Sequence, residues 1–284
     1  VWDVLRRGVA AGLTLTTAQR HGMPVYLADG LRGGIHLTRE GDGDIAITPA
    51  LEIVLDEAKL ASARTGVEVV VIVAASRMRH PLDARTLARL AARYAGDGPG
   101  EVVGFGLSND ERMGQTSAFS AAFGIARRAG LAALPHGGEL LGPESVREVV
   151  TSLNPHRLGH GVRTSEDLEL LDRLIEEGIA FEVCPTSNVH LGVYQDFASV
   201  PLPLLMERGA TIALGADDPL LFHSRLLEQY ANAREVFDLS DRQLANLARQ
   251  SIEASLASQS SKRRWYARIE EWVSSETPGA GSTA

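Results

Sequence analysis

Three short segments combine residues that could bind a metal ion and move protons. His136 is followed by two glycines and Glu139, His160 lies between two glycines, and Asp217 is followed directly by Asp218. Histidine nitrogens and carboxylate oxygens are common zinc ligands, and a nearby glutamate can act on the substrate as a proton shuttle. Together the three segments predict a metal-dependent hydrolase.

Taken singly, each segment also has a structural explanation. His136 could lie in a surface turn, and His160 could satisfy a buried hydrogen bond. An aspartate before Pro219 is typical of a helix N-cap, although this explains Asp218 better than Asp217. Two adjacent carboxylates repel each other, and burying both is costly without a cation. The occurrence of all three segments at predicted strand ends favours one shared site.

Six apolar segments that alternate with helical segments are expected to position these residues. The first, residues 67–75, is apolar on both faces, as a parallel strand covered by helices requires. The predicted strands are residues 67–75, 101–107, 131–135, 157–159, 179–184 and 210–214. The predicted helices are residues 51–63, 85–94, 118–128, 144–153, 165–177 (beginning at Ser165), 202–208, 225–237 and 241–270.

Repeated strand–helix units with short connections predict an α/β protein with a parallel sheet. No glycine-rich phosphate-binding motif follows a strand, which disfavours an open dinucleotide-binding sheet. Because strand ends of a closed barrel converge on one mouth, residues far apart in sequence meet there. We therefore predict a (β/α)8 TIM-like barrel whose first strand or strands are missing from this chain.

The barrel is predicted to occupy residues 1–273 as a single domain, followed by a flexible tail at residues 274–284. The first 48 residues are rich in glycine and aspartate, and only residues 2–7 have a clear helical pattern. The tail consists mainly of Gly, Ser, Thr and Ala, a composition typical of disorder.

The bulk composition limits the classes of partner. The chain has 284 residues, a net charge of −8 and a pI of about 5.5, so it has no basic surplus for a nucleic-acid backbone. No apolar run approaches the roughly 20 residues of a membrane span, and the first residues lack the apolar core of a signal peptide. Cys184 is the single cysteine, so a reducing, cytoplasmic location is expected.

Four segments resemble sequence elements of the adenosine deaminase family of the amidohydrolase superfamily, which includes adenosine, adenine and aminodeoxyfutalosine deaminases. His-Gly-Gly-Glu at 136–139 is similar to the family's His-Ala-Gly-Glu, and Gly-His-Gly at 159–161 to its Gly-His-Gly. Cys-Pro-Thr-Ser-Asn at 184–188 resembles Cys-Pro-Ser/Thr-Ser-Asn, and Ala-Asp-Asp-Pro at 216–219 resembles Thr-Asp-Asp-Pro. Order and spacing agree, and the similarity extends over about residues 51–254.

The resemblance implies a role for each matched residue. His136 and Asp217 would be zinc ligands, and Glu139 would protonate purine N1. His160 would hold and help deprotonate the attacking water on the zinc. Asp218 would position that water or bond N7 of the purine.

Two further residues are expected to contact the substrate. Gly137 lets a ligand approach the backbone closely. Asn109 occupies the place of a family glycine whose backbone contacts purine N3, so it keeps the N–H group and adds a side chain. Asn109 is either a specificity determinant or a turn residue that tolerates left-handed backbone. Cys184 is expected to be a small packed residue near the barrel mouth rather than a nucleophile.

The implied reaction is zinc-dependent hydrolytic deamination of adenosine or 2′-deoxyadenosine to inosine or 2′-deoxyinosine, with release of ammonia. Alternatives are another 6-aminopurine compound (adenine or aminodeoxyfutalosine), another amidohydrolase reaction, or a purine-binding protein without turnover. The chain departs from the family in one respect, since it contains no His-x-His pair to supply two more zinc ligands. Either the pair lies upstream of Val1, or segments have been lost from the chain, or the protein has lost catalysis. The intact Glu139, His160 and Asp217 argue against the last alternative.

Overall fold

The computed structural model describes residues 25–27, 35–39, 43–44, 47–219 and 222–275. Three short strands near the start, β1 (Val25–Leu27), β2 (Ile35–Arg39) and β3 (Gly43–Asp44), pair antiparallel in chain order. The helix predicted at residues 2–7 and residues 276–284 of the predicted tail lie outside the described residues.

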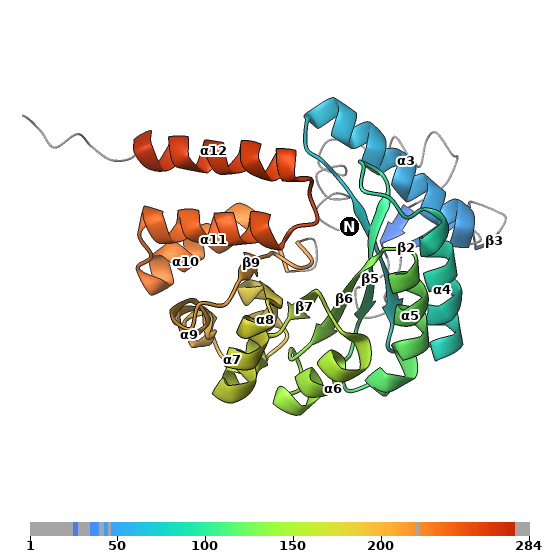
Figure 1. Cartoon of the computed structure of the whole chain (residues 1–284), viewed down its shortest axis with the longest axis horizontal. Helices are drawn as coiled ribbons and strands as arrows, with labels where there is room; N and C mark the ends of the chain where they lie inside the picture. Colours follow the sequence, from blue (N-terminus) through green and yellow to red (C-terminus); the bar gives the residue numbers. More distant parts are fainter. Residues whose placement is uncertain (1–24, 28–34, 40–42, 45–46, 220–221, 276–284) are drawn as a thin grey trace, which may run out of the picture.

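Six parallel strands form a second sheet in strict chain order, β4-β5-β6-β7-β8-β9 (Figure 1). They confirm all six strands predicted from the apolar segments, with ends that differ by a few residues. Their bounds are β4 Val71–Ser76, β5 Val102–Ser108, β6 Ala132–Gly137, β7 Arg157–His160, β8 Ala180–Val183 and β9 Ile212–Leu214. Parallel neighbours in chain order, each joined through a helical segment, are the repeating unit of an α/β barrel.

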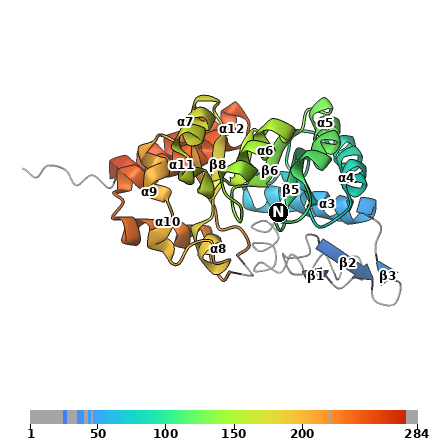
Figure 2. The same cartoon turned by 90° about the horizontal axis from the view of Figure 1, so that it is seen from below.

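Most of the helices lie on the outer side of the curved sheet (Figures 1 and 2). The α-helices are α3 Ile47–Thr65, α4 Pro81–Arg93, α5 Ser120–Arg128, α6 Pro143–Leu153, α7 Leu168–Glu176, α8 Pro185–His190, α9 Leu202–Glu207, α10 Leu226–Phe237, α11 Asp241–Ala254 and α12 Gln259–Ser275. Short 3₁₀ helices occur at Thr116–Phe119, Val162–Glu166 and Phe197–Ser199. In the described part of the chain, no helix has the length and apolar character needed to cross a membrane.

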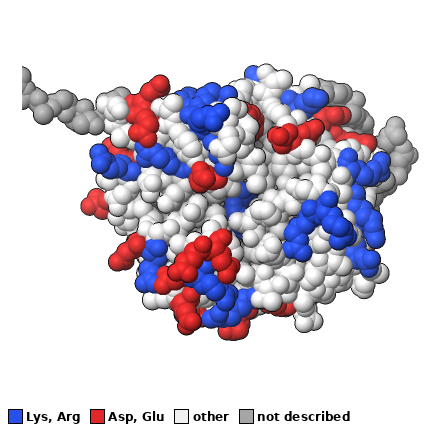
Figure 3. Space-filling model, viewed as in Figure 1, with Lys and Arg blue, Asp and Glu red and all other residues white. Residues whose placement is uncertain are grey.

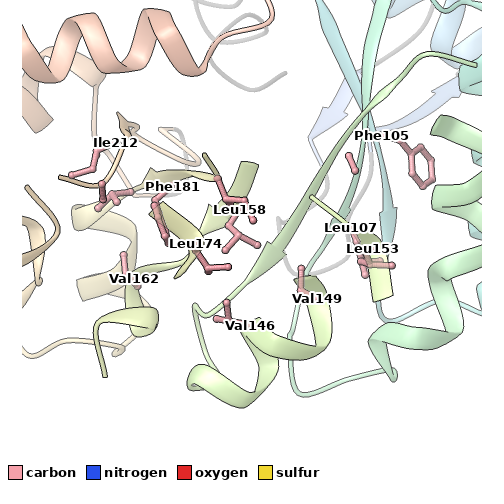
Figure 4. Close-up of a cluster of buried hydrophobic side chains, with 14 of the residues drawn as sticks. Phe105, Leu107, Val146, Val149, Leu153, Leu158, Val162, Leu174, Phe181 and Ile212 are labelled. Atoms are coloured by element: carbon pink, nitrogen blue, oxygen red, sulfur yellow. The ribbon is translucent and has the colours of Figure 1, made fainter. Parts of the chain in front are cut away.

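The core lies between the sheet and these helices, as Figure 4 shows. In α6, Val146, Val149 and Leu153 share one face at helical spacing, and all three are fully buried. Phe105 of β5 packs edge-on against Phe123 of α5, with ring centroids 5.2 Å apart. Burying each large apolar side chain contributes about 1.5–3 kcal/mol, so this packing holds the helices against the strands.

Charged side chains of both signs lie on the face shown in Figure 3, with a group of Lys and Arg at the right, and several charged side chains form ion pairs between exposed groups. Examples are Arg163 with Glu166, Arg208 with Asp172 and Arg249 with Glu270. Because exposed pairs contribute only about 0–1 kcal/mol each, the apolar core is the main source of stability.

Several predicted helix boundaries were wrong. Asp167, not Ser165, caps α7: its side chain accepts a hydrogen bond from the Leu170 amide, while the Ser165 hydroxyl bonds back to Val162 in a 3₁₀ turn. The helix predicted over residues 241–270 is two helices, because the extended residue Ser255 ends α11 and its hydroxyl bonds the Ile252 carbonyl. Helix α12 also continues to Ser275, two residues into the predicted tail.

Candidate active site

The parallel register brings the carboxyl ends of the six strands to one edge. Gly137 pairs with His160, Ser76 with Ser108, and Val183 with Leu214. The residues that follow each strand therefore face a common mouth, as the barrel prediction requires.

Glu139, His160 and Asp217 meet at this mouth. One possible ligand atom from each lies within 4.8 Å of the other two. The Nε2 atom of His160 is 3.4 Å from Oε1 of Glu139 and 3.9 Å from Oδ2 of Asp217. Glu139 and His160 are buried, and Asp217 is partly exposed. The structure thus brings together three residues that are separated by 21 to 78 positions in the sequence (160 − 139 = 21, 217 − 139 = 78).

His136 lies beside this group. Its ring centroid is 4.9 Å from that of His160, and its buried Nδ1 has no hydrogen-bond partner among the described residues. A Cβ at Gly159 would lie 2.6 Å from that Nδ1, so only glycine fits next to the ring. Burial and the neighbouring His160 lower the pKa of His136 to about 4, which keeps the ring neutral, as a metal ligand must be.

Two of these residues have left-handed backbone that is uncommon outside glycine. The φ angles are 64° at His160 and 53° at Asp217, and Asn109 at the end of β5 has a φ of 73°. Such a conformation costs about 1–2 kcal/mol per residue and persists where the surroundings determine it, often at functional sites. The fold therefore maintains unfavourable local backbone at three of the predicted site residues.

The environment shifts the proton affinities of the two buried groups. Burial raises the pKa of Glu139, and the carboxylate of Asp217 raises it further, outweighing the opposing charge of His160. For His160, burial lowers the pKa, but the carboxylates of Glu139 and Asp217 outweigh it, so the pKa is raised. Both side chains therefore bind a proton more tightly than they would in water, which suits residues that exchange protons with a substrate.

The donor set fits a metal ion. Histidine nitrogens and carboxylate oxygens are the ligands that zinc and related divalent ions use, and a catalytic zinc takes three protein ligands with one position open. A cation would also offset the cost of placing the Glu139 and Asp217 carboxylates together. The predicted ligands, His136 and Asp217, both lie at this mouth, and Glu139 and His160 add two further donors.

Comparison with known proteins places the chain in a family. The sequence model of adenosine deaminase matches residues 27–272. The chain belongs to the adenosine deaminase family. A Streptomyces coelicolor relative provisionally named adenosine/adenine deaminase is 54% identical over 227 residues, which cover 80% of this chain and 65% of the relative. An adenine deaminase of Agrobacterium fabrum is 38% identical over 211 residues, which cover 74% of this chain and 64% of the relative. The chain thus spans less than two thirds of the length of these relatives.

A solved structure confirms the fold class. The adenine deaminase of Arthrobacter aurescens superposes with a TM-score of 0.76 at 28% identity, covering 81% of this chain and 69% of that one. The predicted α/β, TIM-like barrel class of this family is therefore correct, and β4 to β9 are six of its strands. The family and the donor group together support a metal cofactor.

Two residues of α8 that were given no role from sequence support the site. The Ser187 hydroxyl donates a 2.6 Å hydrogen bond to Oδ2 of Asp217, and the Asn188 amide nitrogen lies 3.5 Å from Nδ1 of His160. Both side chains are fully buried. The Cys-Pro-Thr-Ser-Asn segment was the available signal, but this six-residue helix was not predicted.

Ser187→Ala is expected to weaken metal binding about 10–100-fold, the usual effect of removing a hydrogen bond that orients a ligand. Titration of zinc into metal-free protein measures it. Ser120→Ala is the matched control, because that hydroxyl bonds only a backbone carbonyl on the exposed side of α5. Equal zinc affinity in Ser187→Ala and the control would show that the hydrogen bond to Asp217 does not support a ligand.

The three predicted substrate contacts occupy the same mouth but differ in their local setting. Asp218 is buried, and its carbonyl accepts a hydrogen bond from the Phe222 amide. A Cβ at Gly137 would lie 2.9 Å from Val149, so glycine also lets α6 pack closely. The Asn109 side chain donates to the Ser76 hydroxyl at 2.8 Å and so links two strand ends. Contact of these residues with a substrate stays a prediction.

Cys184 is the small packed residue that was predicted. It is buried at the start of α8, its thiol lies 3.6 Å from the Glu182 carbonyl, and burial raises the pKa of the thiol well above its ordinary value. Two other histidines also have local structural roles: His80 caps α4, and His156 accepts a hydrogen bond from the Ala133 amide.

Proposed function

We propose that this adenosine deaminase family member is a zinc-dependent hydrolytic deaminase of 6-aminopurines, with free adenine as its preferred substrate. The observation that carries the proposal is the buried group of Glu139, His160 and Asp217 at one edge of the sheet. In the overall reaction, water adds at C6 of the purine and ammonia leaves, so adenine and water become hypoxanthine and ammonia. We also propose that residues 1–273 form a single barrel domain, as predicted from the sequence.

Each site residue has a defined task in this proposal. His136 and Asp217 would hold the zinc, which would supply a water molecule whose pKa is lowered to about 7. Glu139, whose pKa is raised by burial, donates a proton to ring nitrogen N1 and so makes C6 more electrophilic. His160, within 3.4 Å of Glu139, accepts a proton from the attacking water.

Recognition of the purine is assigned to the residues around this group. Asp218, next to Asp217, accepts a hydrogen bond from the ring or orients the water. The backbone of Gly137 and the amide of Asn109 border the purine on the side of β5 and β6. In this proposal C6 would lie between the zinc ligands and Glu139, which is the arrangement that the reaction requires.

The names of the related proteins favour adenine over the nucleosides as the substrate. Sequence motifs alone placed adenosine and 2′-deoxyadenosine first, with adenine and aminodeoxyfutalosine as alternatives. The Agrobacterium fabrum relative and the Arthrobacter aurescens structure are both named adenine deaminase, and the Streptomyces coelicolor name covers both substrates. Adenine is therefore placed first for this chain.

A substrate comparison tests the proposal. Zinc-loaded protein is incubated with adenine, adenosine, 2′-deoxyadenosine and aminodeoxyfutalosine, and released ammonia and the ultraviolet spectrum of the purine are followed. We expect kcat/KM for adenine to exceed that for each other substrate at least about tenfold, or roughly 1.4 kcal/mol of transition-state binding. Preference for a nucleoside would overturn the assignment of adenine, and purine binding without ammonia release would overturn the enzymatic proposal.

A further inference from the structure

Glu111, just beyond the end of β5, has a carboxylate that accepts five hydrogen bonds, four from the amides of one turn and one from a hydroxyl in the first turn of α6. The turn connects β6 to α6 and contains Glu139. The five donors are the amides of Gly138 at 2.6 Å, Glu139 at 3.0 Å, Leu140 at 2.8 Å and Leu141 at 2.9 Å, and the hydroxyl of Ser145 at 2.6 Å. The Glu111 side chain is 4% exposed, so water does not replace these donors. A single buried carboxylate therefore holds four consecutive backbone amides.

Arg77, just beyond the end of β4, fixes the other side of the same turn. Its guanidinium donates to the His136 carbonyl at 2.9 Å and to the Thr116 hydroxyl at 2.8 Å. Arg77 is also buried, and its positive charge interacts favourably with Glu111. The two residues hold opposite ends of the segment that runs from His136 to Leu141.

This segment needs external support because of its composition. Gly137 and Gly138 have more backbone freedom than other residues, and Gly138 has a φ of 73°. Without fixed partners the turn could adopt several conformations, and the carboxyl of Glu139 would move with it. A displacement of about 1 Å can lower a catalytic rate about 100-fold.

The charged form of Glu111 is the form that accepts all five bonds. Burial opposes that form, but the hydrogen bonds from Ser145 and the backbone amides outweigh it, and the pKa of Glu111 lies below its ordinary value. Hydrogen bonds to a charged acceptor are roughly twice as strong as those between neutral groups. A neutral amide in its place would offer one acceptor oxygen and point its NH₂ group at backbone donors.

We propose that Glu111 is a positioning residue that, together with Arg77, holds the 136–141 turn so that the Glu139 carboxyl stays within reach of His160. Glu111 acts through the turn and touches no reacting atom. The catalytic consequence rests on the proposed deaminase function, whereas the effect on the turn does not. Two measurements separate these parts.

Amide hydrogen exchange tests the effect on the turn without any substrate. In Glu111→Gln, the protection factors of amides 138–141 are expected to fall at least about tenfold, whereas those of the strands β4 to β9 stay unchanged. Glu101→Gln is the matched control, because the Glu101 carboxylate accepts a single exposed amide hydrogen bond, from Gly98, and lies outside the turn. Unchanged protection of amides 138–141 in Glu111→Gln would overturn the proposal, whether or not the protein deaminates purines.

A double-mutant cycle tests the catalytic consequence. Glu111→Gln alone is expected to lower kcat about 10–100-fold with KM changed less than about threefold, and Glu111→Asp to restore part of the loss. In a Glu139→Gln background, the same change is expected to lower kcat less than about twofold further, because its effect passes through Glu139. Additive losses would show that Glu111 acts elsewhere and would overturn the positioning role. Absence of deamination in the unmodified protein would overturn the proposed function only.

A milder variant keeps the test valid if Glu111→Gln does not fold. Ser145→Ala removes one of the five donors and leaves the carboxylate bonded to the four amides. It is expected to lower protection of amides 138–141 about two- to fivefold and kcat by a similar factor. Protection and kcat equal to those of the unmodified protein, in a folded Ser145→Ala, would contradict the proposal.

Discussion

Glu139→Gln is expected to lower kcat for the preferred purine about 10²–10⁴-fold while the bound zinc is retained. The amide has nearly the same shape as the carboxyl group, but it has no acidic proton to donate to N1. Burial raises the pKa of Glu139, so this carboxyl group binds its proton more tightly than an exposed glutamate does. Steady-state kinetics and metal analysis of the same preparation measure both quantities.

The matched control is Glu144→Gln, an exposed glutamate in the first turn of α6 that pairs with Arg147. It should retain full activity, because surface charge pairs contribute little. Full activity in Glu139→Gln would exclude the proton-transfer role. Loss of zinc from Glu139→Gln would instead identify Glu139 as a zinc ligand. The geometry allows this role, because a carboxylate oxygen of Glu139 lies within 4.8 Å of donor atoms of His160 and Asp217.

Asp217→Ala is expected to reduce zinc affinity by more than about 100-fold, beyond the 10–100-fold typical of residues that only orient a ligand. Deamination should fall in parallel and recover partly at high zinc concentration. Removal of this carboxylate also deprives the Ser187 hydroxyl of its acceptor, so the effect of Ser187→Ala should largely disappear in the Asp217→Ala background. Zinc titration followed by activity measurement provides the data.

Asp172→Asn serves as the control for Asp217→Ala, since Asp172 pairs with Arg208 on the exposed side of α7. Its zinc affinity should equal that of the unmodified protein. Unchanged zinc affinity in Asp217→Ala would rule out this residue as a ligand. Lost affinity with a melting temperature close to that of the metal-free protein would show that the change is confined to the site.

Much of the fold follows from local sequence patterns. A β-branched apolar run such as residues 67–75 predicts a buried parallel strand, and regular spacing of apolar residues predicts the helices that cover it. All six parallel strands were predicted, from such runs and from the regular alternation of strand and helical segments. Boundaries were less certain: the end of α11 depends on the Ser255 hydroxyl, and the start of α7 depends on which of two possible caps is used.

The chemical character of the site was also accessible from sequence. His136, His160 and Asp217 follow predicted strands, and parallel strands direct their carboxyl ends to a common edge. The structure places the Glu139, His160 and Asp217 donor atoms within 4.8 Å of one another, as this argument requires. The variants above test their roles toward zinc and purine.

Sequence by itself determined where the parallel strands lie along the chain, the family motifs and the donor types, because these depend on residue identity and short-range periodicity. Only the tertiary structure showed that Glu111 holds a turn 27 to 34 residues further along the chain, and that Ser187 orients Asp217 from 30 residues away. Such contacts depend on which strand ends become neighbours and on the backbone conformation at each end. Local sequence patterns contain neither, since both are set when the sheet and its covering helices pack together.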